Sequence, residues 1–279
     1  MQAFSASLSG MQAGLKWLDN IGNNVANEDT PGFAENTQSF EDALTSAVTA
    51  NATAPGVAGR LTPPGWNGGT GVVATATENN FAQMPLETTG NQTDLAINGS
   101  GFFLVRGANG QIELTKAGNF QWSKNAAGQF ELTTPTGEAV LDTNGNPIVE
   151  PTHPTGSFSV GPDGTVSFGS GGASSGTARQ QRIAIAEIPL PNISLVAQSN
   201  NVFTVQPGFT PRIVNAAGGA GGAATAAAGT IQQGALAMSN VDLTVQMTDM
   251  IQAQQMFAIN EEALQLTNQM QQDASSLQG

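Results

Sequence analysis

The feature of the sequence that most constrains its fold is a stripe of apolar residues at each end of the chain. Near the N-terminus, these residues recur in alternating steps of four and three, which places them on one face of an α-helix. They are Phe4, Leu8, Met11, Leu15, Leu18, Gly22 and Val25. Pro31 and Gly32 break this pattern, because proline lacks a backbone donor and glycine tolerates a positive φ. We therefore expect an N-terminal helix that ends before Thr30.

The C-terminal segment, residues 239–279, repeats this pattern. Its stripe consists of Leu243, Met247, Met250, Phe257 and Leu264. Ser239 or Asn240 can cap a helix that begins here, and the segment carries five acidic residues but no Lys or Arg. A helix with a single apolar stripe is marginally stable alone in water. We expect the two terminal helices to pair with each other, or with those of other copies, as a coiled coil or hairpin.

Between the two ends, the apolar pattern has the short period of β-strands. Eight runs fit this pattern, namely 101–105, 112–114, 120–122, 130–132, 158–160, 166–168, 183–185 and 202–205. Turn dipeptides such as Asn98-Gly99 and Asn144-Gly145 separate them and favour hairpins. Short strands joined by hairpin turns predict an antiparallel all-β domain, so the fold class is α+β.

The segments on either side of the predicted β domain have the composition of linkers, since they are rich in Ala, Gly, Thr and Pro. The predicted organisation is an N-terminal helical assembly segment at 1–44, an extended linker at 45–79, the central β domain at 80–215, an Ala/Gly-rich linker at 216–238 and a C-terminal helical assembly segment at 239–279. The β domain is thus inserted between two ends that pair.

Composition excludes several functional classes. The chain has no Cys, one His and a net charge of −13, and only 10% of its residues are charged, against a usual share of about 25%. These counts argue against a zinc protein, a cysteine enzyme and a nucleic-acid binder, which would need clustered Lys and Arg. No stretch is apolar enough for a membrane span. Lys16 and Asp19 interrupt any secretory signal core, so we expect no cleaved signal peptide.

Two motifs invite a chemical interpretation, and each has a simpler one. Asp142, Asn144 and Asn146 place oxygen atoms at alternate positions, as calcium loops do, but the later bidentate Glu is missing and a hairpin turn explains the same residues. His153 lies between two prolines with no nucleophile motif elsewhere. We therefore expect no catalytic residue, no metal and no cofactor.

Several motifs together resemble the flagellar axial proteins, the family of rod, hook and hook-associated proteins. The N-terminal signature is Leu18–Asn27 followed by Thr30–Phe33, and the C-terminal one is Ser239–Thr244 with Met250–Gln254. The first hairpins of the rod and hook β domain are similar to Thr93–Phe103 and Lys116–Phe120. The motif residues of the N-terminal signature are Asn23, Asn24, Ala26, Asn27, Thr30, Pro31, Gly32 and Phe33. The chain departs from the family pattern at Gln255–Phe257, where a Tyr is usual.

The resemblance implies a structural subunit of the bacterial flagellar basal-body rod, of the distal or proximal type. Such a subunit passes through the flagellar export apparatus and assembles through its terminal helices into a tubular drive shaft in the basal body. Its partners would be copies of itself and other rod and hook proteins, with neither nucleic acid nor membrane insertion. The alternative within the family is a hook or hook-like protein. The alternative from a different class is a secreted enzyme that acts on polysaccharide.

Overall fold

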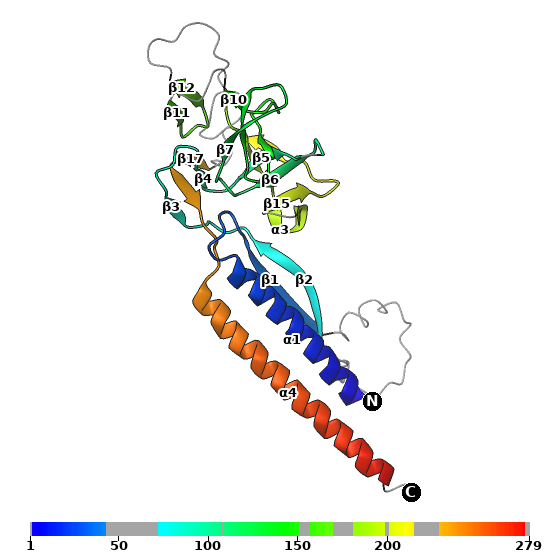
Figure 1. Ribbon diagram of the computed structural model, residues 1–279. Coiled ribbons are helices and arrows are strands. Elements are labelled where there is room, and N and C mark those ends of the chain that lie inside the picture. The colour runs from blue at the N-terminus through cyan, green and yellow to red at the C-terminus, as the bar shows by residue number, and fades with distance from the viewer. Residues whose placement is uncertain are drawn as a thin grey trace. The chain divides into compact units, whose positions relative to one another are not determined.

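The computed structural model describes residues 2–42, 72–107, 109–150, 157–169, 181–198, 201–214 and 229–276, and it divides into two compact units (Figure 1). The helical unit comprises residues 1–26, 36–79 and 241–279. The β unit comprises residues 27–35 and 80–240. The helical unit is thus built from both ends of the chain, and the β unit from its middle.

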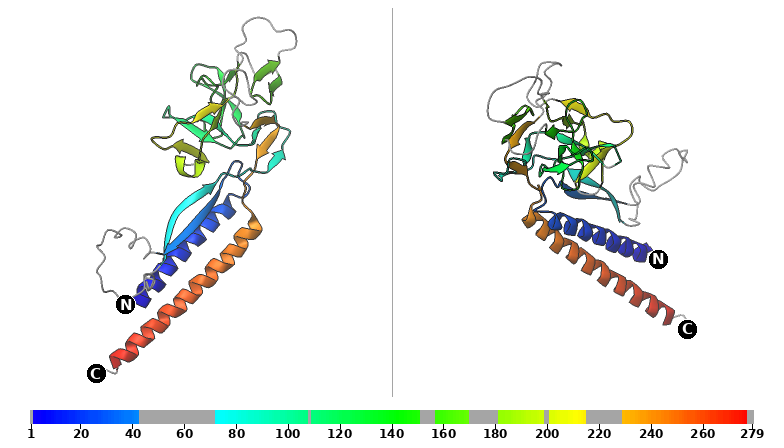
Figure 2. Two further views of the ribbon diagram at one scale, coloured as in Figure 1. Left: turned by 180° about the vertical axis from the view of Figure 1, so that it is seen from behind. Right: turned by 45° about the horizontal axis from the view of Figure 1, so that its top comes forward.

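The helical unit contains two long helices, α1 (Gln2–Ala26) and α4 (Leu243–Ser276). They lie side by side in all the ribbon views (Figures 1 and 2). A two-stranded sheet of β1 (Glu35–Asp42) and β2 (Val72–Asn80) accompanies them. As predicted, α1 ends before Thr30.

The β unit is antiparallel at every pairing whose register is described. Its main sheet has the order β10-β8-β9-β5-β6-β15-β14, with β7 beside β8, β13 beside β5 and β16 beside β13; β11 pairs with β12, β17 with β4 and β18 with β3. The strands are β3 (Leu86–Thr88), β4 (Leu95–Asn98), β5 (Phe102–Arg106), β6 (Ile112–Thr115), β7 (Gln121–Lys124), β8 (Phe130–Thr133), β9 (Ala139–Val140), β10 (Val149–Glu150), β11 (Ser157–Val160), β12 (Val166–Gly169), β13 (Ile185–Glu187), β14 (Leu195–Ala197), β15 (Val202–Val205), β16 (Arg212–Val214), β17 (Thr230–Gln233) and β18 (Ala235–Ala237). One short helix, α3 (Pro191–Ser194), precedes β14. The predicted α+β class with an antiparallel β domain is confirmed.

Strand β5 shows how the β unit builds two apolar cores from one sheet. Successive side chains of a strand point to opposite faces, and here both faces are covered. Phe103 and Val105 belong to the larger core, whereas Phe102 and Leu104 belong to the second. This explains why the run from Phe102 to Val105 is continuously apolar instead of alternating.

The motif at Asp142 forms the predicted hairpin turn. One carboxylate oxygen of Asp142 accepts hydrogen bonds from the backbone N–H groups of Asn144 and Asn146, each at 2.8 Å. Gly145 has a φ of 78°, a left-handed conformation that glycine adopts without steric cost. The carboxylate therefore stabilises the turn through the backbone, and the turn interpretation is confirmed.

Three segments differ from the predicted organisation. The predicted N-terminal helical segment contains β1, the linker predicted at 45–79 ends in β2, and the linker predicted at 216–238 contains β17 and β18. Strands β17 and β18 pair with β4 and β3, which are far away in sequence. Their tertiary pairing, and not a local apolar alternation, makes these residues strands. The remaining linker residues, 45–71 and 216–228, and His153 lie outside the described residues.

Candidate assembly interface

The contact between α1 and α4 is antiparallel and depends on small residues of α1. A Cβ atom at Gly10 would lie 2.8 Å from the side-chain nitrogen of Asn260, and one at Gly14 would lie 3.6 Å from the terminal methyl of Met256. Asn24 bonds to Gln246 further along the same pair of helices. The residue numbers rise along α1 as they fall along α4, so one register holds over this length. Absence of a side chain at Gly10 lets the helices approach closely.

Asn24 is the polar centre of the helical unit. It is 1% exposed, and its amide nitrogen donates to the backbone oxygen of Asn36 at 2.9 Å and to the side-chain oxygen of Gln246 at 3.1 Å. Its amide oxygen accepts from the backbone N–H of Asn36 at 2.9 Å. A single side chain therefore joins α1, α4 and β1. Both N–H donors and the oxygen of this buried amide therefore have partners, so its burial leaves no polar atom unsatisfied.

The predicted seam residues lie on a different side from this buried contact. The residues of α1 that are buried include Ala13, Ile21 and Asn24, whereas Leu15 is 49% exposed and Leu8 is also exposed. On α4, Met247 is exposed. The seam residues that are partly buried are Met11, Leu18, Val25, Leu243, Met250, Phe257 and Leu264. The side chain of Phe4 lies outside the described residues. None of the described seam side chains is fully buried within the single chain.

Helix α4 exposes a further set of apolar side chains. Ile259 is 66% exposed, and the others are Val245, Ile251, Leu266 and Met270. Within the described part of α4, only Gln246 and Ala253 are fully buried. Apolar surface of this extent on a helix usually marks a contact with another protein.

The remaining residues of the N-terminal motif form a tight turn after α1. The backbone N–H of Thr30 donates to the oxygen of Asn27 at 3.1 Å, and that of Phe33 donates to Thr30 at 3.2 Å. Gly32 has a φ of 73°, and a Cβ there would lie 2.2 Å from the backbone nitrogen of Ala117. Only glycine fits this position, because both the conformation and the close approach exclude a side chain. Pro31 accepts a hydrogen bond from Asn201.

The other motif residues lie around this turn and at the end of α1. Phe33 is buried, whereas Ala26, the last residue of α1, is exposed. The side-chain oxygen of Asn23 accepts a hydrogen bond from the amide nitrogen of Asn36 at 3.2 Å. The motif therefore brings two neighbouring asparagines, Asn23 and Asn24, onto the same residue of β1.

Three residues at the points where the chain passes between the units are bonded to one another. The backbone N–H of Glu35 donates to the side-chain oxygen of Asn240 at 2.8 Å. Asn240 in turn donates to the backbone oxygen of Asn80 at 2.9 Å, and Asn80 donates to the carboxylate of Glu35 at 3.2 Å. This closed ring, hereafter the crossing triangle, ties together three segments that are distant in sequence.

Lys116 is a buried cation in the β unit. Its ammonium group donates to the backbone oxygen of Phe81 at 3.3 Å and lies 5.5 Å from the centre of the Phe102 ring. Burial lowers the pKa of Lys116 below its ordinary value of 10.5. The carbonyl and the ring face both favour the charged form, and they offset part of the desolvation cost.

The described residues contain neither a typical metal site nor a membrane-spanning helix. No group of three His, Cys, Asp or Glu side chains that could hold a metal ion occurs among them. In the same ranges, no helix is long and apolar enough to cross a membrane. The two terminal helices instead carry exposed apolar side chains.

Sequence reasoning found the apolar stripes and the asparagine motif but missed their partners. Asn36, Gln246 and the residues of the crossing triangle are single polar residues that belong to no apolar or catalytic pattern. The only available signal was Asn24 itself, an amide within a helix whose neighbours Ile21 and Val25 are apolar. A polar residue among apolar ones on a helix indicates a buried side chain that needs a hydrogen-bonding partner.

Two family models match the chain, one within the β unit and one that covers α4 and the strand before it. Residues 96–168, within the β unit, match the flagellar hook protein FlgE/F/G D1 domain. Residues 232–277, which include α4, match the flagellar basal body rod FlgEFG protein C-terminal model. A β unit inserted between two paired helical ends therefore defines the class as the rod and hook proteins of the bacterial flagellum.

Full-length relatives distinguish the rod from the hook. The chain is 32% identical to the flagellar basal-body rod protein FlgG of Bacillus subtilis over 99% of both chains, and 30% identical to that of Borreliella burgdorferi over 99% of this chain and 98% of the relative. The flagellar hook protein FlgE of Treponema pallidum is 35% identical, but over only 43% of this chain and 25% of its own. The chain belongs to the family of flagellar basal-body rod proteins, and it is a structural subunit of the rod.

Proposed function

We propose that the chain assembles through α1 and α4 into a tubular drive shaft, with these helices forming a coiled-coil core between subunits. The observation that carries this proposal is the exposed apolar surface along both helices, which the single chain leaves in contact with water. Leu8, Leu15 and Met247 belong to the predicted seam and lie on this surface. Burying them against other copies would gain roughly 25 cal/mol per Å² of apolar surface.

The partly buried seam residues have a supporting role in this proposal. Met11, Leu18 and Val25 on α1, and Met250, Phe257 and Leu264 on α4, keep some surface exposed at the edges of the internal contact. A neighbouring helix that covers the exposed stripe would complete their burial. The two units then have separate tasks, because the helical unit supplies the core of the tube and the β unit its outer wall.

The proposed partners follow from the same surface and from the relatives. They are copies of this chain, other rod and hook proteins, and the flagellar export apparatus that delivers the subunit. No catalytic step is part of the proposal. The relatives are named flagellar basal-body rod proteins, which supports a role without enzymatic activity.

The proposal is tested by raising the concentration of the purified chain and following it by sedimentation and electron microscopy. We expect tubes or short rods above a critical concentration, because each added subunit buries the same helical surface. A chain that stays monomeric throughout would contradict self-assembly. The enzyme alternative requires glycan turnover that one carboxylate substitution abolishes, and that result would overturn the structural role.

A further inference from the structure

Three asparagine–glycine pairs lie among the described residues of the β unit, at the end of a strand or in a hairpin turn. They are Asn98-Gly99, Asn109-Gly110 and Asn144-Gly145; a fourth pair, Asn67-Gly68, lies outside the described residues. Such a pair is chemically labile, because asparagine is a thermolabile residue and the following glycine has no side chain to keep its backbone nitrogen away from the asparagine amide. The three described pairs differ in how firmly they are held.

The Asn144-Gly145 pair is held through both of its residues. The Asn144 backbone N–H donates to one carboxylate oxygen of Asp142 at 2.8 Å, and its side-chain amide donates to the other at 3.4 Å. The backbone N–H of Gly145 donates to the Asp142 carbonyl at 2.9 Å, and the Gly145 carbonyl accepts from Arg106. Several of these bonds would have to break before the glycine nitrogen could move toward the asparagine side chain.

The Asn98-Gly99 pair is held by its strand and by close packing. Asn98 is the last residue of β4 and lies opposite Thr230 of β17. The backbone N–H of Gly99 donates to the side-chain oxygen of Gln83 at 3.1 Å. A Cβ atom at Gly99 would lie 2.7 Å from the Cα atom of Gly229, so the backbone has little room to turn here.

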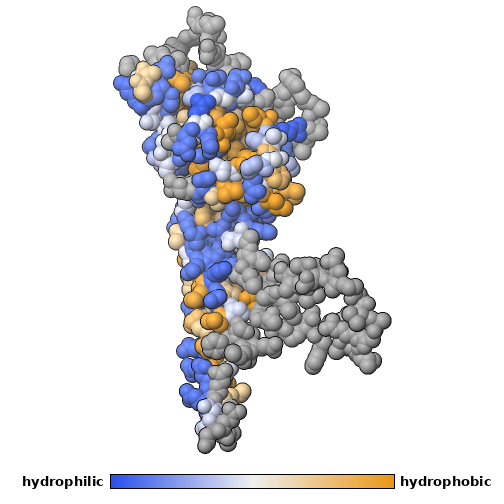
Figure 3. Space-filling model, turned by 90° about the vertical axis from the view of Figure 1, so that its right-hand side faces the viewer, coloured by the Kyte–Doolittle hydropathy of each residue, from blue (hydrophilic) through white to orange (hydrophobic). Residues whose placement is uncertain are grey.

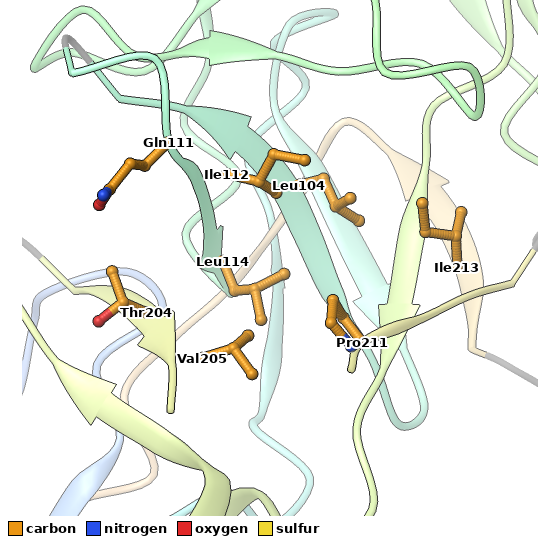
Figure 4. Close-up of a pocket in the computed structure, with 8 residues that line it drawn as sticks. All are labelled: Leu104, Gln111, Ile112, Leu114, Thr204, Val205, Pro211 and Ile213. Carbon is orange, nitrogen blue, oxygen red and sulfur yellow. The ribbon is translucent and has the colours of Figure 1, made fainter. Parts of the chain in front are cut away.

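The Asn109-Gly110 pair lies at the tip of the hairpin between β5 and β6, where both residues are exposed. The N–H of Gly110 donates to the Gly107 carbonyl at 2.9 Å, but no hydrogen bond joins the Asn109 side chain to another described residue. Below the tip, Leu104 of β5 pairs with Leu114 of β6, and both are buried beside the apolar pocket drawn in Figure 4. The exposed tip of an anchored hairpin opens more readily than its strands.

We propose that Asn109 is a site of self-modification, at which the chain converts its own asparagine to aspartate and isoaspartate. When the Gly110 hydrogen bond opens, the Gly110 backbone nitrogen loses its proton and attacks the side-chain carbonyl carbon of Asn109. A carbon–nitrogen bond forms to give a cyclic imide, and the side-chain nitrogen takes up a proton and leaves as ammonia. Water then opens the imide at one of its two carbonyl carbons, which yields aspartate or isoaspartate. Water is the only co-reactant.

The conversion changes the surface of the β unit and leaves its core intact. It adds one negative charge to a chain that already carries −13. The charge appears at an exposed turn, and hydrophilic surface is widespread on the face of the β unit in Figure 3. Changes at exposed positions outside buried contacts usually alter stability little. We therefore expect modified subunits to stay folded and to accumulate with time.

The proposal is tested by incubating the purified chain at mildly alkaline pH, which favours loss of the backbone proton. Samples are digested with pepsin at acid pH, and each pair is followed by mass spectrometry through the replacement of NH by O. We expect Asn109 to convert about tenfold faster than Asn98 or Asn144, because the latter two have additional bonds to break. In guanidinium chloride, where no pair is held, the three sites should convert at similar rates. Labelling by an isoaspartyl methyltransferase identifies the isoaspartate product.

Two matched variants assign the product to its site. Asn109→Gln should lose the fast conversion, because its longer side chain would have to close a larger ring that forms more slowly. Asn144→Gln should leave the conversion of Asn109 unchanged. Equal rates at the three sites in the folded chain, faster conversion at Asn98 or Asn144, or an unreactive Asn109 would each overturn the assignment. The reaction occurs within one chain, so none of these outcomes bears on helical assembly.

Discussion

The two units of the chain differ in how many of their large apolar side chains they bury completely. Of the twelve largest side chains that are fully buried among the described residues, eleven belong to the β unit and one, Ile21, to the helical unit. The helical unit instead exposes such residues along both of its helices. The β unit therefore completes its core with its own residues. The helical unit is held by small residues and amides, and it leaves large apolar side chains exposed along both helices.

The sharpest test of this contrast is a charge on the exposed stripe. Leu15→Asp on the exposed stripe, or Leu264→Asp at the edge of the contact between α1 and α4, would place an unpaired carboxylate in the packed core of the proposed tube, which costs several kcal/mol at every subunit. We expect assembly and motility to be abolished while the β signal in circular dichroism stays. Gln12→Ala, on the polar side of α1, should assemble normally. Leu15→Asp subunits that still form functional flagella would refute the role of the stripe.

A cavity in the β unit should have a large effect of a different kind. Phe103 is 0% exposed and packs edge-on against Phe120, with 5.1 Å between ring centres. Phe103→Ala should lower the free energy of unfolding by about 3–5 kcal/mol, measured by urea denaturation of the subunit. Leu15→Ala is the matched control, and it should change the stability of the monomer by less than about 1 kcal/mol. Similar losses from the two substitutions would remove the contrast between the units.

Removing the amide of Asn24 should have an intermediate effect on the helical unit. Asn24→Ala leaves the partly buried backbone N–H of Asn36 and the buried side chain of Gln246 without this partner. Unsatisfied buried groups cost about 1–3 kcal/mol, so the helical signal should melt earlier while the β unit is unaffected. Asn23→Ala removes the exposed neighbouring bond and should cost less than about 0.5 kcal/mol. Equal effects of the two variants would show that burial of Asn24 is unimportant.

The smallest effect concerns the pH dependence of the β unit through Lys116. Its pKa is lowered in the folded state, so between the folded value and 10.5 the unfolded chain binds more protons than the folded one. The free energy of unfolding therefore rises with pH across this window. Lys116→Met lacks this titration. Urea denaturation at neutral pH and near pH 10 should show that the wild type gains stability relative to the variant, and a relative loss would contradict the sign.

The strands of the β unit could be predicted where local chemistry determines them. The run from Phe102 to Val105 and the turns at Asn144-Gly145 and Asp163-Gly164 combine apolar strand residues with residues that favour a hairpin. Strands β17 and β1 could not be predicted in this way. Their sequences, Thr-Ile-Gln-Gln and Glu-Asn-Thr-Gln-Ser-Phe-Glu-Asp, have little apolar alternation, and they become strands by pairing with distant segments.

The helices show a different limit of sequence reasoning. Their stripes identified the apolar positions, but not which face the single chain buries. Gly10, Ala13 and Gly14 give little hydrophobic signal, yet their small size allows α4 to approach α1 closely. A hydropathy pattern weights large side chains. It therefore points to the surface that the single chain leaves exposed, and it overlooks the contact that glycine and alanine make possible.

The crossing triangle has a mechanical consequence. The backbone passes between the two units four times, and Glu35, Asn80 and Asn240 stand at three of these passages. A load that passes along the chain from one unit to the other is carried by these covalent links. Because the three links are bound to one another, they share the load side by side, and none can be peeled away alone. Separating any one of the three segments therefore requires breaking its hydrogen bonds to another, so the three resist separation together.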